Sequence, residues 1–491
     1  MRRTEKIIDS SLKKTDLHER DAYKWWVLAT VSLGSLTVAL DNSILATCLP
    51  RLANVFRTDS SVIAWVNLAY YITSQSLMLT LAKIGDAKGR QKVFMAGLGF
   101  YTFGLIACAL SQTVGQLIAF RAVQGVGAGT GYSLSMAIAV AVFPPEERGK
   151  ALGILTGVNS IGLVAGPVLG GLILDAMGWR AVFYTRAPMA FGALIMTWMI
   201  IKEQKRTEEI FNLDIAGSAS LFAFLSFLLL FLSFGGKRGF ATPLILLLGC
   251  LVTVFLVLFL ISEKKATQPI VKLSFFRMRL FSAATISVGV QTTATSFVIF
   301  LVPFCLMEAL GSSGSVVGIF MALLALPLLV ISPVSGRLSD KIGSTFLATL
   351  GMCVVCVALF LLGRLGAHPT YLSIGIGVAM CGMGMAIFQP PNNSAIMGSV
   401  PKSMLGTASA INMVARQVGA SSGIALAGAL FSGYQTDVLH RLSSMGIDLL
   451  TAKRMASLAG FEKAMLVGLA IASVGIFTSL VRGPRQKDQI K

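Results

Sequence analysis

Residues 82–90 of this chain read Ala-Lys-Ile-Gly-Asp-Ala-Lys-Gly-Arg, and residues 336–343 read Gly-Arg-Leu-Ser-Asp-Lys-Ile-Gly. In both stretches a Gly or Ala opens the motif, an Ile or Leu stands third, and Asp-x-x-Gly ends it. Both are short basic segments between long apolar runs. A motif that recurs in equivalent surroundings indicates two related halves, and parallel halves of this kind are an architecture of membrane transporters.

Apolar runs of about 20 residues, long enough to cross a bilayer as helices, surround these two segments. The chain of 491 residues is 55% hydrophobic and only 13% charged, which excludes an ordinary soluble domain. We therefore predict an all-α polytopic membrane protein with fourteen transmembrane helices, at 25–48, 61–82, 93–111, 114–138, 151–174, 181–202, 216–234, 242–262, 281–306, 315–336, 346–363, 371–395, 405–431 and 463–482.

The two copies of the motif lie eight predicted helices apart, whereas a plain duplication of six helices would separate them by six. The simplest arrangement is two six-helix bundles with two extra central helices between them. The predicted organisation is a cytoplasmic N-terminus (1–24), an N-terminal bundle (25–202), a linker with the two extra helices (203–262), a C-terminal bundle (263–482) and a cytoplasmic tail (483–491).

The charge of the chain predicts its orientation. Lys and Arg total 41 against 22 acidic residues, a net charge of +19. Roughly 28 basic residues lie on the side of the two termini and about 10 on the other side, so the positive-inside rule places both termini in the cytoplasm and the protein in the cell membrane. This explanation of the basicity removes the need for a nucleic-acid partner. Segment 432–462 is predicted to be a polar to amphipathic external loop.

The sequence offers no site for a metal or a cofactor. Its seven cysteines lie in or at the ends of apolar runs, and its three histidines are scattered. A nucleophile–base pair and a phosphate-binding Gly-rich loop are also lacking, which argues against a membrane enzyme or receptor. Without an ATP site, transport would have to draw on an ion gradient.

At the repeated loops the sequence resembles motif A of the major facilitator superfamily, and the likeness covers nearly the whole chain. Ala82 replaces the first glycine, but Asp86, Gly89 and Arg90 are in place, with Asp340 and Gly343 in the second copy. The resemblance implies a cytoplasmic gate, since a carboxylate at a helix end can pair with Arg and with the N-terminus of a facing helix. The alternative is a solvated turn.

Two further motifs of the same superfamily have counterparts in the fourth and fifth predicted helices. The fourth contains Arg121 and Gln124 before Gly125-x-Gly127, similar to motif B, and an Arg inside a span indicates a functional site. Snorkelling of Arg121 to the external surface is the alternative. The fifth resembles motif C, which in the superfamily marks exporters, through Gly153, Gly162, Gly166, Pro167, Gly170 and Gly171. Such glycines permit close helix contact, although generic small-residue packing would also use them.

Four other segments are similar to the fourteen-helix drug:proton antiporters of the superfamily. They are Leu40-Asp41-Asn42-Ser43-Ile44, Trp179-Arg180, Leu213-Asp214-x-x-Gly217 and Arg416-Gln417-x-Gly419. The resemblance implies the major facilitator fold and efflux coupled to protons, with a monomer as the working unit.

The charges predicted inside the spans suggest a coupling device. They are Asp41, Arg121, Arg186 and Arg416, with Gln124 beside them in the substrate cavity. Protonation of Asp41 would break a pair with Arg, although a permanent ion pair is the alternative. Arg186 departs from the family, which has Asn at this position, and it would either face Asp41 or snorkel outward. An extra cation at Asp41 favours neutral or anionic cargo over lipophilic cations.

These features together predict a proton-coupled efflux transporter that exports drugs or small metabolites by alternating access. A proton-coupled importer of a sugar or organic acid is the alternative within transport. The expected partners are a small-molecule substrate, protons and the lipid bilayer.

Overall fold

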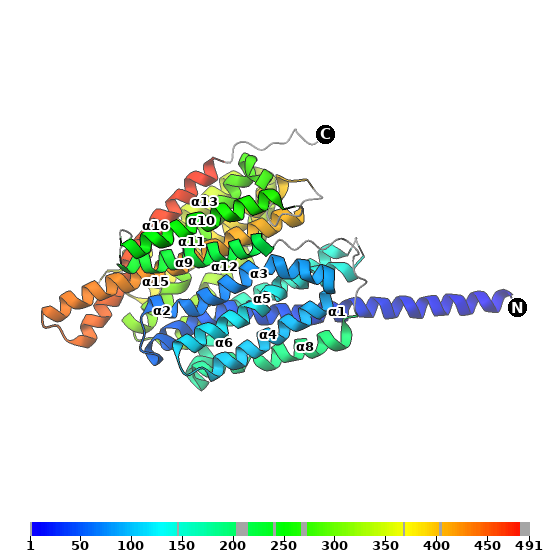
Figure 1. Cartoon of the computed structure of the whole chain (residues 1–491), viewed down its shortest axis with the longest axis horizontal. Coiled ribbons are helices and arrows are strands. Elements are labelled where there is room, and N and C mark those ends of the chain that lie inside the picture. The colour runs from blue at the N-terminus through cyan, green and yellow to red at the C-terminus, as the bar shows by residue number, and fades with distance from the viewer. Residues whose placement is uncertain are drawn as a thin grey trace.

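A computed structural model describes residues 2–144, 147–202, 215–238, 242–266, 273–366, 369–401 and 405–481. Within these ranges the chain forms helices joined by turns, and the long helices run side by side (Figure 1). Eleven of the described helices are long and apolar enough to cross a membrane. Three further members of the bundle, namely α3, α15 and the pair α7–α8, complete the predicted fourteen.

The N-terminal bundle consists of α1 (Arg2–Val55), α3 (Trp65–Lys88), α4 (Arg90–Leu110), α5 (Val114–Val142), α6 (Arg148–Met177), α7 (Trp179–Tyr184) and α8 (Ala187–Ile200), with the short α2 (Ser60–Ile63) after α1. The C-terminal bundle consists of α11 (Arg279–Phe304), α12 (Gly314–Ile342), α13 (Ser344–Leu362), α14 (Tyr371–Gly398), α15 (Leu405–Ser444) and α16 (Leu449–Leu480). A 3₁₀ helix, η1 (Leu273–Arg277), precedes α11, and a π-helical turn, η2 (Cys305–Ala309), follows it.

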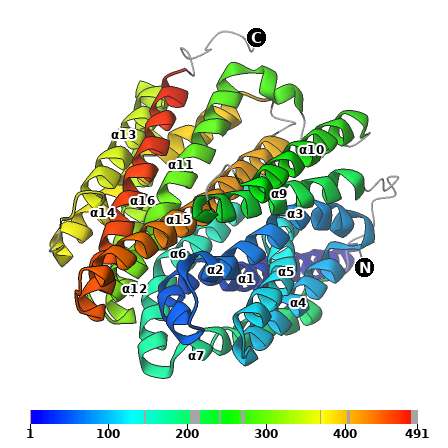
Figure 2. The ribbon, with the colours of Figure 1, turned by 60° about the vertical axis from the view of Figure 1, so that its left-hand side comes forward.

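Helix contacts in the two bundles follow one scheme. In the first bundle α1 packs against α6, α5 and α8, while α3 and α4 both pack against α5. In the second, α11 packs against α15, α14 and α16 in the same way, while α12 and α13 both pack against α14. The contacts between bundles are also matched, because α6 with α12 corresponds to α15 with α3. The structure is therefore two related six-helix bundles, as the repeated motif predicts (Figure 2).

The repeated motif forms the same turn twice. Gly89 separates α3 from α4 with φ of 106°, and Gly343 separates α12 from α13 with φ of 94°. Side chains other than glycine rarely adopt such values, which accounts for the glycine in both copies. The Arg90 guanidinium donates to the Ala137 carbonyl at 3.3 Å. The side chains of Asp86 and Asp340 lie outside the described part of the structure, so the gate stays a prediction.

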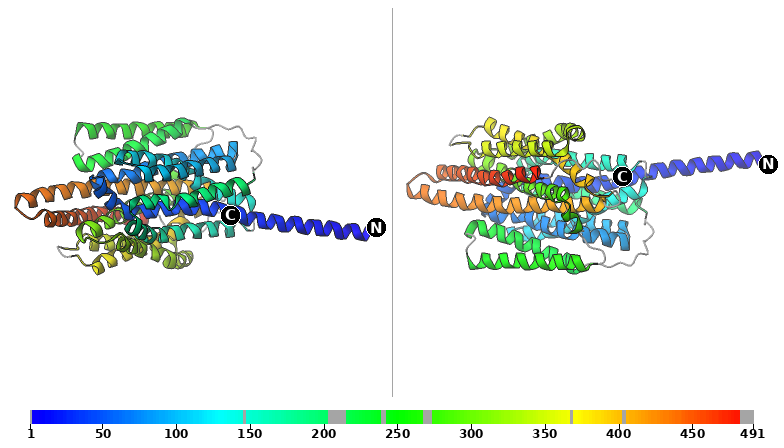
Figure 3. Two further views of the ribbon diagram at one scale, coloured as in Figure 1. Left: turned by 90° about the horizontal axis from the view of Figure 1, so that it is seen from below. Right: turned by 90° about the horizontal axis from the view of Figure 1, so that it is seen from above.

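The two extra helices, α9 (Ile215–Arg238) and α10 (Pro243–Lys265), lie at the edge of the molecule in both views of Figure 3. Helix α9 contacts α3 of the first bundle and α15 of the second, and α10 packs on α9. Polar contacts fix α9 on α3, since Thr80 Oγ1 lies 2.7 Å from Ser218 Oγ and Trp65 Nε1 donates to Ser233 Oγ. Asp214, which belongs to one of the segments similar to the fourteen-helix antiporters, lies outside the described residues.

The prediction of an external loop at 432–462 is wrong. The segment is a helical hairpin. Helix α15 continues to Ser444 and α16 begins at Leu449, so the hairpin extends beyond the bundle at the end opposite the long N-terminal part of α1 (Figure 1). The segment has no proline, and the Asp448 side chain caps α16 by accepting from the backbone amides of Leu450 and Thr451. The polar residues of the segment correctly indicated that it is exposed, but they did not indicate that it is irregular.

The hairpin provides a test of the predicted orientation. In a variant that lacks the exposed native Cys250, Ser444→Cys should react with an impermeant thiol reagent added to intact cells. Lys264→Cys, at the opposite end, should react only after the cells are permeabilised. The reverse labelling pattern would place both termini outside.

Candidate functional site

Asp41 lies in Ala22–Val55, the part of α1 that is apolar enough to cross a membrane, and none of its surface is exposed. Its Oδ2 accepts a hydrogen bond from Arg121 Nη1 at 2.7 Å, and its Oδ1 accepts one from Arg186 Nη1. Both contacts are ion pairs, and both arginines are buried, with exposed fractions of 1% and 3%. One carboxylate therefore neutralises one of two cations in an apolar interior, and the cluster carries a net positive charge while Asp41 is ionised.

Arg121 of α5 is held by hydrogen bonds to both α3 and α5. Arg121 Nε donates to the Val66 carbonyl of α3 at 3.0 Å, and Arg121 Nη1 also donates to Gln124 Oε1 of α5 at 2.8 Å. The guanidinium carbon lies 4.1 Å from the centre of the Tyr70 ring, a cation–π contact. The side chain thus points inward, and the alternative of snorkelling to the surface is wrong.

Arg186 lies at a break that the sequence analysis did not predict. The expected single helix 181–202 is two helices, α7 and α8, joined at Thr185 and Arg186. Pro188 explains the break, because proline has no backbone N–H and its ring clashes with the carbonyl four residues earlier. The joint places the Arg186 guanidinium on Asp41, while its Nε donates to the Val182 carbonyl at 2.9 Å. Its Nη2 is buried and has no hydrogen-bond partner among the described residues.

The glycines of α6 bring that helix against α1 at the depth of Asp41. A Cβ added at Gly162 would lie 2.9 Å from Ala39 Cβ, and one at Gly170 would lie 2.9 Å from the Ile44 carbonyl oxygen. Gly166 lies directly on the Ser43 side chain. Ser43 Oγ in turn donates to the Gly162 carbonyl at 3.0 Å. The packing is therefore a specific contact along the α1 segment that carries Asp41.

The end of α6 also closes on the second bundle. Gly171 lies against the Gly314 backbone, and a Cβ at Gly318 would lie 2.5 Å from the Pro167 carbonyl oxygen. Asp175 accepts from the backbone amides of Gly314 at 2.8 Å and Ser315 at 2.7 Å, at the N-terminus of α12. A carboxylate at this position is stabilised by the helix dipole. These contacts hold the two bundles together at the end where the α15–α16 hairpin protrudes.

Two predicted site residues lie apart from these contacts. A Cβ at Gly153 would meet nothing within 4 Å, so this glycine does not take part in the close contact expected of it. Arg416 lies on α15, where its Nη2 is 3.4 Å from Asn393 Oδ1 of α14. Within the described part of the chain, Arg416 makes no ion pair with Asp41 or any other carboxylate.

The sequence did not lead us to predict two buried amide side chains, Gln75 and Gln291. Gln75 of α3 donates through Nε2 to Ser421 Oγ of α15 at 3.2 Å. Gln291 of α11 is fully buried, and neither atom of its amide has a hydrogen-bond partner among the described residues. An amide inside an apolar run is the signal that could have identified both, although it is weaker than that of a charge.

The two ion pairs favour the ionised form of Asp41. Protonation of Asp41 would leave both buried guanidinium groups without their carboxylate. Among the described residues, no group of three or more His, Cys, Asp or Glu side chains could hold a metal ion.

Comparison with protein families and solved structures identifies similar proteins. Residues 31–424 match the model of the Major Facilitator Superfamily. The riboflavin transporter RibZ of Clostridioides difficile is 30% identical over 83% of this chain and 88% of its own. The multidrug resistance protein Stp of Mycobacterium tuberculosis is 27% identical over 84% of this chain and 77% of its own, and the tetracenomycin C resistance and export protein of Streptomyces glaucescens gives the same values.

Solved structures support the fold. A bacterial homologue of the human lysosomal transporter Spinster, in an inward-facing and occupied conformation, has a TM-score of 0.72 at 14% identity and covers 94% of this chain and 97% of its own. A D-xylose–proton symporter has a TM-score of 0.61 at 15% identity, with 89% and 96% covered. At these identities the likeness concerns the fold alone.

The contact between α6 and α1 can be tested with a pair of glycine variants. Gly170→Ala places a methyl group against the Ile44 backbone, which cannot move aside, so we expect a loss of about 1–3 kcal/mol in stability. Gly153→Ala enters open space and should be neutral or slightly stabilising. Thermal unfolding of the purified variants measures both, and equal unfolding temperatures would contradict the assignment of Gly170 to the contact.

Proposed function

The chain is a member of the major facilitator superfamily, and on that premise we propose that it exports drugs or small metabolites in exchange for protons. The superfamily consists of transporters, which supports transport over the alternative of a receptor or enzyme. The proposal concerns the direction of transport, the coupling ion and the residues that couple them.

The buried cluster of Asp41, Arg121 and Arg186 is the observation that carries the proposal. An ionised Asp41 compensates the guanidinium groups, whereas a protonated Asp41 leaves two cations in an apolar interior. Proton binding therefore destabilises the present packing of α1, α5 and α7–α8 and favours a rearranged one. This is the property required of a site that couples a proton to a change of conformation.

The paired contacts between the bundles support alternating access. Helix α6 meets α12 at the end with the hairpin, and the equivalent pair is α15 with α3. Rocking of one bundle against the other would separate both pairs at one face of the membrane while bringing them together at the opposite face. Because α6 also packs on α1 beside Asp41, a change at the carboxylate reaches the contact with α12 through one helix.

Export is the direction favoured by the α6 glycines and by the names of relatives. Two of the similar proteins are named for multidrug resistance and for tetracenomycin C resistance and export. The riboflavin transporter adds a vitamin-sized metabolite as a candidate cargo. We further propose that both termini are cytoplasmic and that one chain, which contains both bundles, works as a monomer in the cell membrane.

Reconstitution tests the proposal directly. Proteoliposomes that enclose a pH-sensitive dye are given a pH gradient, and riboflavin, a cationic drug and an anionic drug are added in separate experiments. Proton-coupled exchange predicts a substrate-dependent loss of the gradient, with substrate and protons moving in opposite directions. Movement in the same direction would support a proton-coupled importer instead.

The role of Asp41 is tested by Asp41→Asn, which keeps the volume of the side chain and removes its charge. We expect at least about a tenfold loss of gradient-driven export, because the proton has no site. Exchange of labelled for unlabelled substrate, which needs no net proton movement, should persist. Gradient-driven export at the wild-type rate would remove Asp41 from the mechanism.

A second variant controls for folding. Asp41→Asn leaves two buried arginines unpaired, a change that typically costs about 3–5 kcal/mol. The double variant Asp41→Asn/Arg186→Asn restores the net charge of the cluster and should recover much of the stability without recovering coupling.

Arg186 is predicted to set both the pH dependence and the charge preference of transport. Arg186→Asn removes one of the two cations that stabilise ionised Asp41, so Asp41 accepts a proton at higher pH. The pH optimum of export should therefore move upward. Transport of cationic substrates should improve relative to anionic ones. Superimposable pH profiles for variant and wild type would contradict this role.

A further inference from the structure

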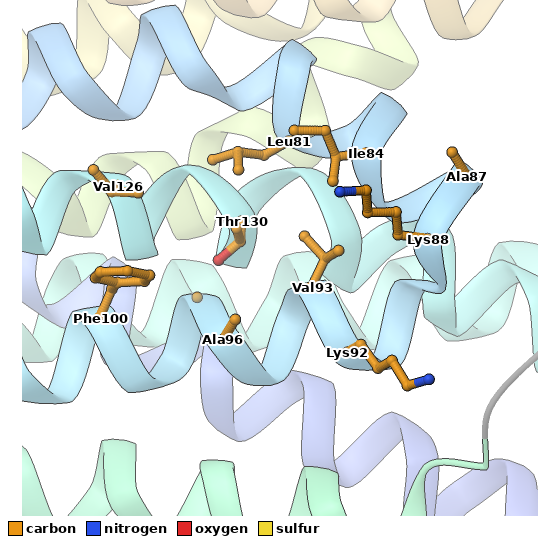
Figure 4. Close-up of a pocket in the computed structure, with 11 residues that line it drawn as sticks. Leu81, Ile84, Ala87, Lys88, Lys92, Val93, Ala96, Phe100, Val126 and Thr130 are labelled. Atoms are coloured by element: carbon orange, nitrogen blue, oxygen red, sulfur yellow. The ribbon is translucent and has the colours of Figure 1, made fainter. Parts of the chain in front are cut away.

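A crevice in the first bundle uses none of the residues of the charged cluster. It lies between α3, α4 and α5 and has a volume of about 590 Å³ (Figure 4). Its walls are mainly apolar and include Leu81, Ile84, Val93, Ala96, Phe100 and Val126. At its floor α4 and α5 are in close contact, because Gly97 lies directly against Thr130.

The crevice opens toward the bilayer rather than toward water. Phe100, at one end of it, is 52% exposed, and Phe103, Ile106 and Leu110 continue the exposed apolar face of α4. Helix α4 is long and apolar enough to cross the membrane. An exposed apolar face on such a helix contacts lipid chains, so the crevice is a lateral opening that a lipid chain can enter.

Two lysines lie at the other end of the crevice. Lys88 is in the last turn of α3, Lys92 is in the first turn of α4, and both are exposed. In Figure 4 the Lys88 side chain extends over the crevice toward Ile84. These positions flank the turn at Gly89, where the two helices end and the polar surface of the membrane is expected. None of the described residues that line the crevice is acidic.

We propose that this crevice binds an anionic phospholipid, with an acyl chain along its apolar walls and the phosphate at Lys88 and Lys92. Basic residues at the ends of transmembrane helices bind anionic head groups, because they attract the phosphate near the membrane surface. A free phosphate would leave the apolar walls uncovered. A zwitterionic lipid would cover the walls but would gain less from two cations.

Lipid binding to the purified full-length chain tests this assignment. Phosphatidylglycerol and phosphatidylcholine with identical acyl chains are titrated separately in mild detergent, and bound lipid is counted by native mass spectrometry. We expect one phosphatidylglycerol to bind about tenfold more tightly than phosphatidylcholine. Glycerol 3-phosphate should not compete. Equal binding of the two lipids, or competition by glycerol 3-phosphate, would overturn the proposal.

Three variants locate the lipid. Lys88→Gln/Lys92→Gln should weaken phosphatidylglycerol binding about tenfold and abolish the preference over phosphatidylcholine. Lys264→Gln/Lys265→Gln removes the same charge from the last turn of α10, outside the crevice, and should leave binding unchanged. Ala96→Phe fills the crevice without changing the charge and should also weaken binding. An equal effect of the two lysine pairs, or an unchanged affinity in Ala96→Phe, would assign the lipid to another surface.

Discussion

The contact of Asp41 with the guanidinium groups of Arg121 and Arg186 joins three elements that are distant in sequence. Moving ions into an apolar interior costs several kcal/mol for each ion, and only partners in good geometry offset that cost. Helix α1 must therefore face α5, and the joint between α7 and α8 must turn toward both. The break at Pro188 and the contacts of Arg121 with Val66, Gln124 and Tyr70 serve this one requirement.

A second constraint is the width of the space between α1, α6 and α12. Glycines on α6 face both neighbours, so one helix touches the segment that carries Asp41 and also the N-terminal end of α12. Asp175 adds hydrogen bonds to the α12 amides at that end. Since packed interfaces do not deform continuously, a displacement of α1 would be passed to the contact between the bundles rather than absorbed.

Because the two bundles are related by the internal repeat, the contact between α6 and α12 has an equivalent elsewhere between the bundles. Helices α15 and α3 are related to α6 and α12 by the internal repeat, and Gln75 connects them through Ser421 and the Gln417 carbonyl. The charges, however, are not repeated. The first bundle holds the carboxylate and two of the arginines, whereas Arg416 of the second contacts an asparagine. In the proposed mechanism the first bundle responds to protons, and Arg416 is free of carboxylates among the described residues and available to cargo.

The number of membrane helices, the two related bundles and the identity of the buried charges could all be predicted from the order of the residues. Apolar length, a repeated loop and charged residues inside apolar runs are properties of local sequence that a bilayer restricts strongly. The sequence also predicted that Arg121 faces inward. It did not predict the helical hairpin at 432–462, because exposed helices carry polar residues just as loops do.

The contacts that each of these residues makes could not be predicted in this way, because they depend on how the helices pack. From sequence, Arg186 could face Asp41 or the surface. Pro188 by itself accounts for a break near Thr185, but the direction in which that joint turns the Arg186 side chain depends on the packing of α7 and α8 against α1. Gly153 and Gly170 belong to one motif, yet only Gly170 contacts another helix. The crevice between α3, α4 and α5 requires three helices at once. Periodicity fixes which face of a helix is apolar, whereas contacts between distant segments arise only when the whole bundle is packed.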